Sequence, residues 1–172
     1  MTMFHDFYNE VLMGGPVGAP AIKPFRTEWR IAAPDLSLAG SVDFVGTTAA
    51  NEYVIIDWKR SKKLPTSLDN TFRKQGMPPL RHIADCDLNK YFLQLNVYRY
   101  ILEKYYSINV SKMLVVSMHP SLDGYFMAEA PIWHSEVELI LRGIQDKDKD
   151  ASLPPSTVMA PPTMTKLTSS PF

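Results

Sequence analysis

Two carboxylates and an amine stand inside a stretch that otherwise has the pattern of a β-hairpin, GSVDFVGTTAANEYVIIDWKRSKK. Asp43 interrupts the first apolar run, and Asp57 and Lys59 interrupt the second. A hairpin centred on Ala50 would place Asp43 directly opposite Asp57, with Cβ atoms roughly 4.5–5.5 Å apart. Two bare carboxylates at that distance repel each other, and one of them would have to take up a proton.

A divalent cation would remove this conflict between the two aspartates. Hard oxygen ligands on a rigid element suit Mg²⁺ or Mn²⁺, with water filling the remaining coordination positions. Lys59 shares a strand face with Asp57 and lies roughly 7 Å further along, within reach of a phosphate or of an attacking water. The alternative is an edge hairpin that carries an ordinary surface Asp–Lys pair, and the pattern leaves both interpretations open.

The other face of the hairpin is expected to be an apolar core. The residues expected on that face are Val42, Phe44, Val54, Ile56 and Trp58. Glu28 lies in the strand expected over 25–31, and its place in the alternation lets it share the face of Asp43 as a further ligand. The alternative for Glu28 is a solvated strand glutamate paired with Arg26 or Arg30.

The elements that position these residues follow from hydrophobic periodicity and from the placement of Gly and Pro. We expect helices over 3–13, 87–106 and 134–147, and strands over 25–31, 37–46, 52–60, 112–120 and 124–131. The helix over 87–106 is the strongest signal, because apolar residues recur along it at helical spacing, and Asp85 or Asp87 is expected to cap its start. The segment 61–86 has the composition of a long irregular loop.

The charge distribution is informative although the chain has no net charge. Residues 59–81 hold seven basic side chains and one acid, Asp69. An isolated basic run is usually a solvated loop, but the position of this run directly after the two-aspartate hairpin favours contact with phosphates. The candidate nucleic-acid-binding residues are Arg60, Lys62, Lys63, Arg73 and Lys74.

The length of 172 residues indicates one domain with a sizeable core. We expect this domain over 1–149, starting abruptly in helix-like sequence as a truncated domain would, and a disordered Pro/Ser/Thr-rich tail over 150–172. The single cysteine, Cys86, excludes an internal disulfide framework and fits a reducing compartment. No signal peptide or membrane-spanning apolar run is visible, so we expect an intracellular protein without membrane contact.

Four short motifs follow one another along the chain. They are Glu28, then Gly40 to Asp43 as G-S-V-D, Asp57 to Lys59 as D-W-K, and Gln94 to Tyr98 as Q-L-N-V-Y. In this order they resemble the PD-(D/E)XK nuclease superfamily, and more narrowly its RecB-like branch with G-x-x-D, D-x-K and Q-x-x-x-Y motifs. The resemblance covers about residues 25–120.

The resemblance implies a restriction-endonuclease-like α/β core, with a central mixed sheet of about four to five strands flanked by helices in the order αβββαβ. It implies that Asp43, Asp57 and the backbone carbonyl of Trp58 hold one or two Mg²⁺ ions. Glu28 or an upstream histidine, for which His5 is the candidate, would be a further ligand.

The last motif places two side chains on one face of a helix. Gln94 and Tyr98 lie four residues apart, and the resemblance implies that both contact the nucleic acid or brace the metal centre. The alternative for Tyr98 is an ordinary core position, because it also fits the apolar stripe of the helix.

The activity implied by the resemblance is metal-dependent hydrolysis of phosphodiester bonds in DNA, at ends or in single strands, with RNA as an alternative substrate. Lys59 would orient or deprotonate the attacking water and stabilise the transition state. The protein would act alone or within a larger replication or repair polypeptide or complex. Two other functions stay open: a catalytically inactive nucleic-acid-binding module of the same fold, and an interaction domain whose Pro-rich tail docks a partner.

Overall fold

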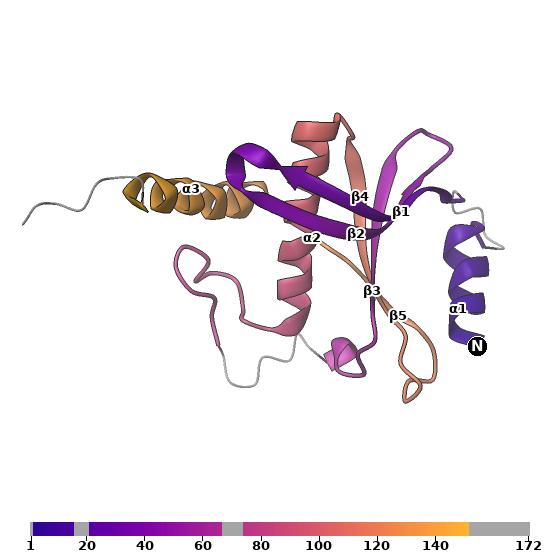
Figure 1. The fold of residues 1–172 in the computed structure, drawn as a ribbon. Coiled ribbons are helices and arrows are strands. Elements are labelled where there is room, and N and C mark those ends of the chain that lie inside the picture. The colour runs from indigo at the N-terminus through magenta and orange to yellow at the C-terminus, as the bar shows by residue number, and fades with distance from the viewer. Residues whose placement is uncertain (1, 16–20, 67–73, 152–172) are drawn as a thin grey trace, which may run out of the picture.

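The computed structural model describes residues 2–15, 21–66 and 74–151. One mixed sheet of five strands forms its centre, in the spatial order β1-β2-β3-β4-β5 (Figure 1). The strands are β1 (Lys23–Ala33), β2 (Leu38–Thr47), β3 (Tyr53–Lys59), β4 (Val110–Ser117) and β5 (Phe126–Glu129). The β3–β4 pair is parallel and the other pairs are antiparallel.

Helices cover both faces of this sheet. Helix α1 (Thr2–Phe7), continued by a π-helical turn (Tyr8–Leu12), lies on one side, and α2 (Asp87–Tyr106) and α3 (His134–Ala151) lie on the other (Figure 1). Short 3-10 turns occur at Pro34–Leu36 and Leu64–Thr66. The order of one helix, three strands, one helix and one strand confirms the predicted α/β fold, which β5 and α3 extend.

The central hairpin is buried on both faces, because each face packs against a different helix layer. Val45 and Ile55 belong to the core under α2 and α3, whereas Phe44, Val54 and Ile56 belong to the core under α1. Strands that are covered on both sides become continuous apolar runs, and the stretch VII before Asp57 has that form. The acid-bearing face is therefore core up to Ile55, and the alternative of an edge hairpin is wrong.

One residue of the expected core face is displaced. Val42 packs into the core under α2 and not with Phe44 under α1. The β1–β2 ladder skips Glu28 and Asp43, and Glu28 has a positive φ of 47°. The alternation predicted along β2 therefore does not hold across Asp43.

The strongest predicted helix, α2, has the bounds expected for it, but its N-terminus is not capped as expected. Cys86 occupies the N-cap position in an extended conformation, without a side-chain hydrogen bond to the helix. Asp85 instead forms an ion pair with Lys90 at 2.9 Å, so the prediction that Asp85 or Asp87 caps this helix is wrong.

Two further sequence predictions concern the C-terminal tail and membrane contact. The expected tail over 150–172 lies outside the described residues from residue 152 onward. Within the described part of the chain, none of the helices combines the length and the apolar character needed to cross a bilayer.

Candidate active site

The sheet opens where the two aspartates meet. The antiparallel register of β2 and β3 pairs Phe44 with Ile56 as its last step, and continuing it sets Asp43 opposite Asp57, as predicted. Beyond this point the two strands share no ladder. Instead, the backbone N–H of Trp58 donates to Asp43 Oδ2 at 2.9 Å. A side chain thus replaces the backbone acceptor, and the sheet edge beside Asp57 is left open.

The carbonyl of Trp58 faces the same opening. The N–H and C=O of one strand residue point toward the same neighbouring strand, and the N–H of Trp58 points toward Asp43. On the other side of the strand, the Lys59 carbonyl accepts from Met118 N at 3.0 Å, toward β4. Two carboxylates and one carbonyl therefore converge where β2 leaves β3.

Asp57 is buried, with 4% of its surface exposed. Its Oδ2 has no hydrogen-bond partner within the described part of the chain. Lys59 Nζ lies 2.6 Å from this oxygen and forms an ion pair with it. The same ammonium lies 4.5 Å from the ring centre of Tyr91 on α2, so Lys59 sits between a carboxylate and an aromatic face.

The surroundings shift the protonation equilibrium of Asp57. Burial raises the pKa of Asp57 above its usual value, and the negative charge of Asp43 adds to this rise. The Lys59 ammonium acts in the opposite direction and offsets the rise only in part. A second positive charge at the opening would therefore stabilise the ionised form of both aspartates.

The opened hairpin packs against α2 through a contact between Gly40 and Tyr98. A Cβ atom at Gly40 would lie 2.5 Å from Tyr98 Cε1, so only glycine lets β2 approach the ring this closely. Gln94 Nε2 donates to Tyr98 Oη at 2.8 Å and fixes the ring from within the helix. The G-x-x-D and Q-x-x-x-Y motifs are thereby in contact, and Tyr98 is half-buried.

Glu28 is not brought together with the aspartates as a third carboxylate. It lies across from Asp43 in the β1–β2 register, but its left-handed backbone takes its side chain out of the strand alternation, and the residue is exposed. Among the described residues, no group of three or more His, Cys, Asp or Glu side chains is placed to hold a metal ion.

His5 is also apart from the aspartates. It is exposed on α1, where Asn9 Nδ2 lies 3.1 Å from its Nδ1. Asp57 belongs to the opposite face of the sheet, since its neighbour Ile55 packs under α2 and Lys59 contacts Tyr91. The basic residues Arg60, Lys62, Lys63 and Lys74 are exposed, and Arg73 lies outside the described residues.

A hollow of about 400 Å³, here called the carboxyl-end hollow, lies where the parallel strands β3 and β4 end. Its lining residues are Phe4, Trp58, Lys59, Arg60, Val116 and Met118. No sequence pattern predicted it, because Phe4 is distant in the chain from the other lining residues and Trp58, taken alone, has the pattern of a core residue. Tyr91 was missed similarly, as one member of the apolar stripe of α2.

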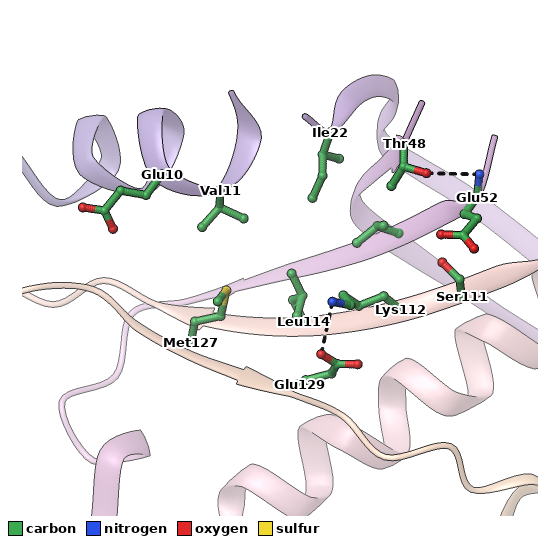
Figure 2. A pocket seen from close by; sticks show the side chains of 11 residues that line it. Glu10, Val11, Ile22, Thr48, Glu52, Ser111, Lys112, Leu114, Met127 and Glu129 are labelled. Atoms are coloured by element: carbon green, nitrogen blue, oxygen red, sulfur yellow. Dashed lines mark hydrogen bonds and ion pairs between the residues drawn. The ribbon is translucent and has the colours of Figure 1, made fainter. Parts of the chain in front are cut away.

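A second hollow of about 300 Å³, the amino-end pocket, lies on the same face at the start of the same two strands. Figure 2 shows Glu10 and Val11 on the helical segment, facing Leu114 and Met127 across it. The other lining residues are Ile22, Thr48, Glu52, Val54, Ser111, Lys112 and Glu129. Three glutamates and one lysine make its rim acidic.

Comparison with known proteins adds little. No protein-family model matches the chain, and no curated protein matches it. Among solved structures, one described as the crystal structure of SSO0001 is similar over 74% of this chain and 51% of its own, at 14% identity and a TM-score of 0.34. The chain therefore spans about half the length of that protein. A likeness at this level carries no conclusion about function.

Proposed function

We propose that this chain is a metal-dependent nuclease that hydrolyses phosphodiester bonds of DNA. The observation that carries the proposal is the meeting of Asp43 with a buried Asp57, whose pKa is raised by burial and by the Asp43 charge although the Lys59 ammonium lies 2.6 Å from its Oδ2. Burying a carboxylate beside a second negative charge is costly for folding. Such costs are concentrated at functional sites, where a ligand of opposite charge offsets them.

The donor set fits a hard divalent cation. Asp43 and Asp57 offer carboxylate oxygens, and the Trp58 carbonyl faces the same opening. Mg²⁺ keeps several of its waters, so one or two protein carboxylates are enough to hold it. When bound here, Mg²⁺ or Mn²⁺ would supply an acidified water and positive charge beside the phosphoryl oxygens.

Each residue of the proposed site would then have a separate role. Asp43, held by the Trp58 amide, and Asp57 would position the water and the phosphate relative to each other. The Lys59 ammonium, confined between Asp57 and the Tyr91 ring, would orient the attacking water and stabilise negative charge in the transition state. Gln94 and Tyr98 would hold the opened hairpin in place through Gly40.

The basic residues after β3 support a polyanionic substrate. Arg60, Lys62 and Lys63 are exposed and follow directly on Lys59, so they would contact phosphates beside the cleaved bond. Binding through such contacts weakens steeply with salt. RNA is an alternative substrate within this proposal. The proposal also allows the chain to act inside a larger intracellular repair or replication assembly.

A second candidate function is a nucleic-acid-binding module without activity. The hydrogen bond from Trp58 N–H to Asp43 and the close Lys59–Asp57 pair would also suit a purely structural cluster. This alternative shares the binding surface and differs only in the absence of cleavage.

The test is cleavage of labelled linear and circular DNA with Mg²⁺, compared with the same reaction in EDTA. Asp57→Asn should lower the rate by at least about 100-fold while the fold persists, because it removes a metal ligand at nearly constant shape. Asp123→Asn, in an exposed loop before β5, is the matched control and should cleave at the wild-type rate. DNA binding without any cleavage would favour the inactive module, and equal cleavage by both variants would refute the proposed site.

A further inference from the structure

The carboxyl-end hollow and the candidate active site share two consecutive residues, Trp58 and Lys59. Trp58 gives its backbone amide to Asp43 and its side chain to the hollow. Lys59 likewise lines the hollow and contacts Asp57. The hollow and the Asp57 side chain lie on opposite faces of β3, which ends at Lys59, so a nucleic-acid strand would connect the two by passing around this end of the strand.

The walls of the hollow are aromatic and apolar. Phe4 is 54% exposed, and its ring centre lies 6.2 Å from that of Trp58, with the planes tilted by 57°. Phe7 meets Trp58 edge-on at 5.0 Å and holds the indole from the core side. A single exposed phenylalanine is ordinary, but this one extends an aromatic surface whose other half is fixed by the core.

The charge of the hollow is positive. Arg60 supplies this charge, since the Lys59 ammonium is paired with Asp57, and none of the described lining residues of the hollow is acidic. A surface that combines aromatic rings with basic side chains is the kind on which single-stranded nucleic acids stack their bases. A volume of about 400 Å³ is in the range of small-ligand pockets.

We infer that the carboxyl-end hollow binds an unpaired nucleobase, stacked against Phe4 and Trp58, while Arg60 contacts the phosphate beside it. The inference rests on the proposed function only for its position next to the cleaved bond; base binding itself does not require cleavage. A paired base cannot enter without leaving its duplex, so the hollow selects single-stranded segments or frayed ends.

The experiment measures equilibrium binding of a fluorescent oligothymidylate in EDTA, where no cleavage occurs, and of an abasic strand with the same number of phosphates. Wild type should bind the abasic strand about 5- to 10-fold more weakly, which is the usual size of one stacking contact. Phe4→Ala should lose a similar factor for oligothymidylate and show no further loss for the abasic strand. Met13→Ala, which removes another exposed apolar side chain just after the same helical segment and outside the hollow, is the control and should bind both strands as wild type does.

Several results would overturn the inference. Equal binding of both strands by wild type would do so without any variant, and so would the absence of detectable binding to either strand. A Phe4→Ala protein that keeps its fold and discriminates as well as wild type would remove Phe4 from the site. Cleavage with Mg²⁺ is scored separately, so base discrimination without cleavage refutes the nuclease alone, and cleavage without discrimination refutes the base site alone.

Discussion

The two ends of the β3–β4 pair present hollows that both have apolar floors but differ in the charge of their rims. Both hollows lie on the α1 face of the sheet, on strands whose core residues include Val54 and Leu114 at one end and Val116 at the other. Phe7, fully buried, belongs to the core between them. The carboxyl-end hollow has Lys59 and Arg60 on its rim, whereas the amino-end pocket has Glu10, Glu52 and Glu129 with Lys112 among them.

This difference shows that the apolar floor does not determine what a hollow can bind. Burial of a flat apolar group would be similar at either end, but the phosphate attached to a nucleobase would be repelled by three glutamates. The rim residues, which contribute little to the core, therefore determine the charge of each hollow. The carboxyl end also carries the buried ion pair Lys59–Asp57, whereas the amino end carries the exposed pair Lys112–Glu129.

The largest effect should come from breaking these two ion pairs in parallel. Lys59→Met should lower the free energy of unfolding in EDTA by about 3 kcal/mol, because it leaves the buried Asp57 carboxylate uncompensated. Lys112→Met should cost less than about 1 kcal/mol, since its pair with Glu129 spans 3.4 Å between side chains that are about half exposed. Chemical denaturation of both variants measures the difference.

A second substitution separates charge from packing at the carboxyl end. Asp57→Asn combined with Lys59→Met removes the uncompensated charge at nearly constant volume, so most of the lost stability should return. If the double variant is as unstable as Lys59→Met, the penalty comes from the packing of the lysine stem against Tyr91, and the buried-charge account is wrong.

Reversing one rim charge at each end should give the next largest effect. Arg60→Glu should weaken oligothymidylate binding roughly 10-fold, because it replaces a phosphate contact with a repulsion. Glu52→Lys should change the same affinity by less than about twofold. It lies six residues before Trp58, about 20 Å along the strand, which exceeds the screening length of about 8 Å at physiological salt.

These two variants carry the opposite charge change, so they also test whether total charge controls binding. Fluorescence anisotropy at several salt concentrations distinguishes the cases. If Glu52→Lys strengthens binding as much as Arg60→Glu weakens it, the contrast between the hollows has no functional meaning and the whole surface acts as one diffuse field.

Local patterns predicted the parts of the site that neighbours along the chain determine. The register of Asp43 and Asp57 follows from the length of one hairpin, and the bounds of α2 follow from periodicity along one helix. The contact between Gly40 and Tyr98 could be expected only as a consequence of the motif resemblance, because those residues come from separate elements.

The remaining features depend on contacts that no local pattern encodes. The left-handed conformation of Glu28 arises where the β1–β2 ladder is interrupted, and strand alternation predicted the opposite placement. Tyr91 and Trp58 have apolar neighbours at core spacing, so their contacts with Lys59 and Phe4 become visible only when helices and strands are placed in three dimensions. Aromatic residues of a candidate site are hidden in this way wherever core and site share one element.

The smallest predicted effect concerns a hydrogen bond to Glu10 on the rim of the amino-end pocket. Tyr125 packs edge-on against Phe7 at 5.3 Å, and its Oη donates to Glu10 Oε2 at 2.6 Å, on the rim of the amino-end pocket. Burial raises the pKa of Tyr125 to about 12, and the bond to Glu10 adds to the rise. Tyr125→Phe keeps the ring and should lower the free energy of unfolding near neutral pH by about 0.5–1 kcal/mol.

The pH dependence of that loss identifies its cause. A tyrosine whose folded pKa lies above its unfolded value of about 10 stabilises the fold fully below pH 10, and this contribution disappears as pH rises toward about 12. The stability difference between wild type and Tyr125→Phe should therefore shrink over that interval, as measured by urea midpoints. A difference that stays constant would assign the loss to packing. The affinity for oligothymidylate should not change, because Tyr125 does not line the carboxyl-end hollow.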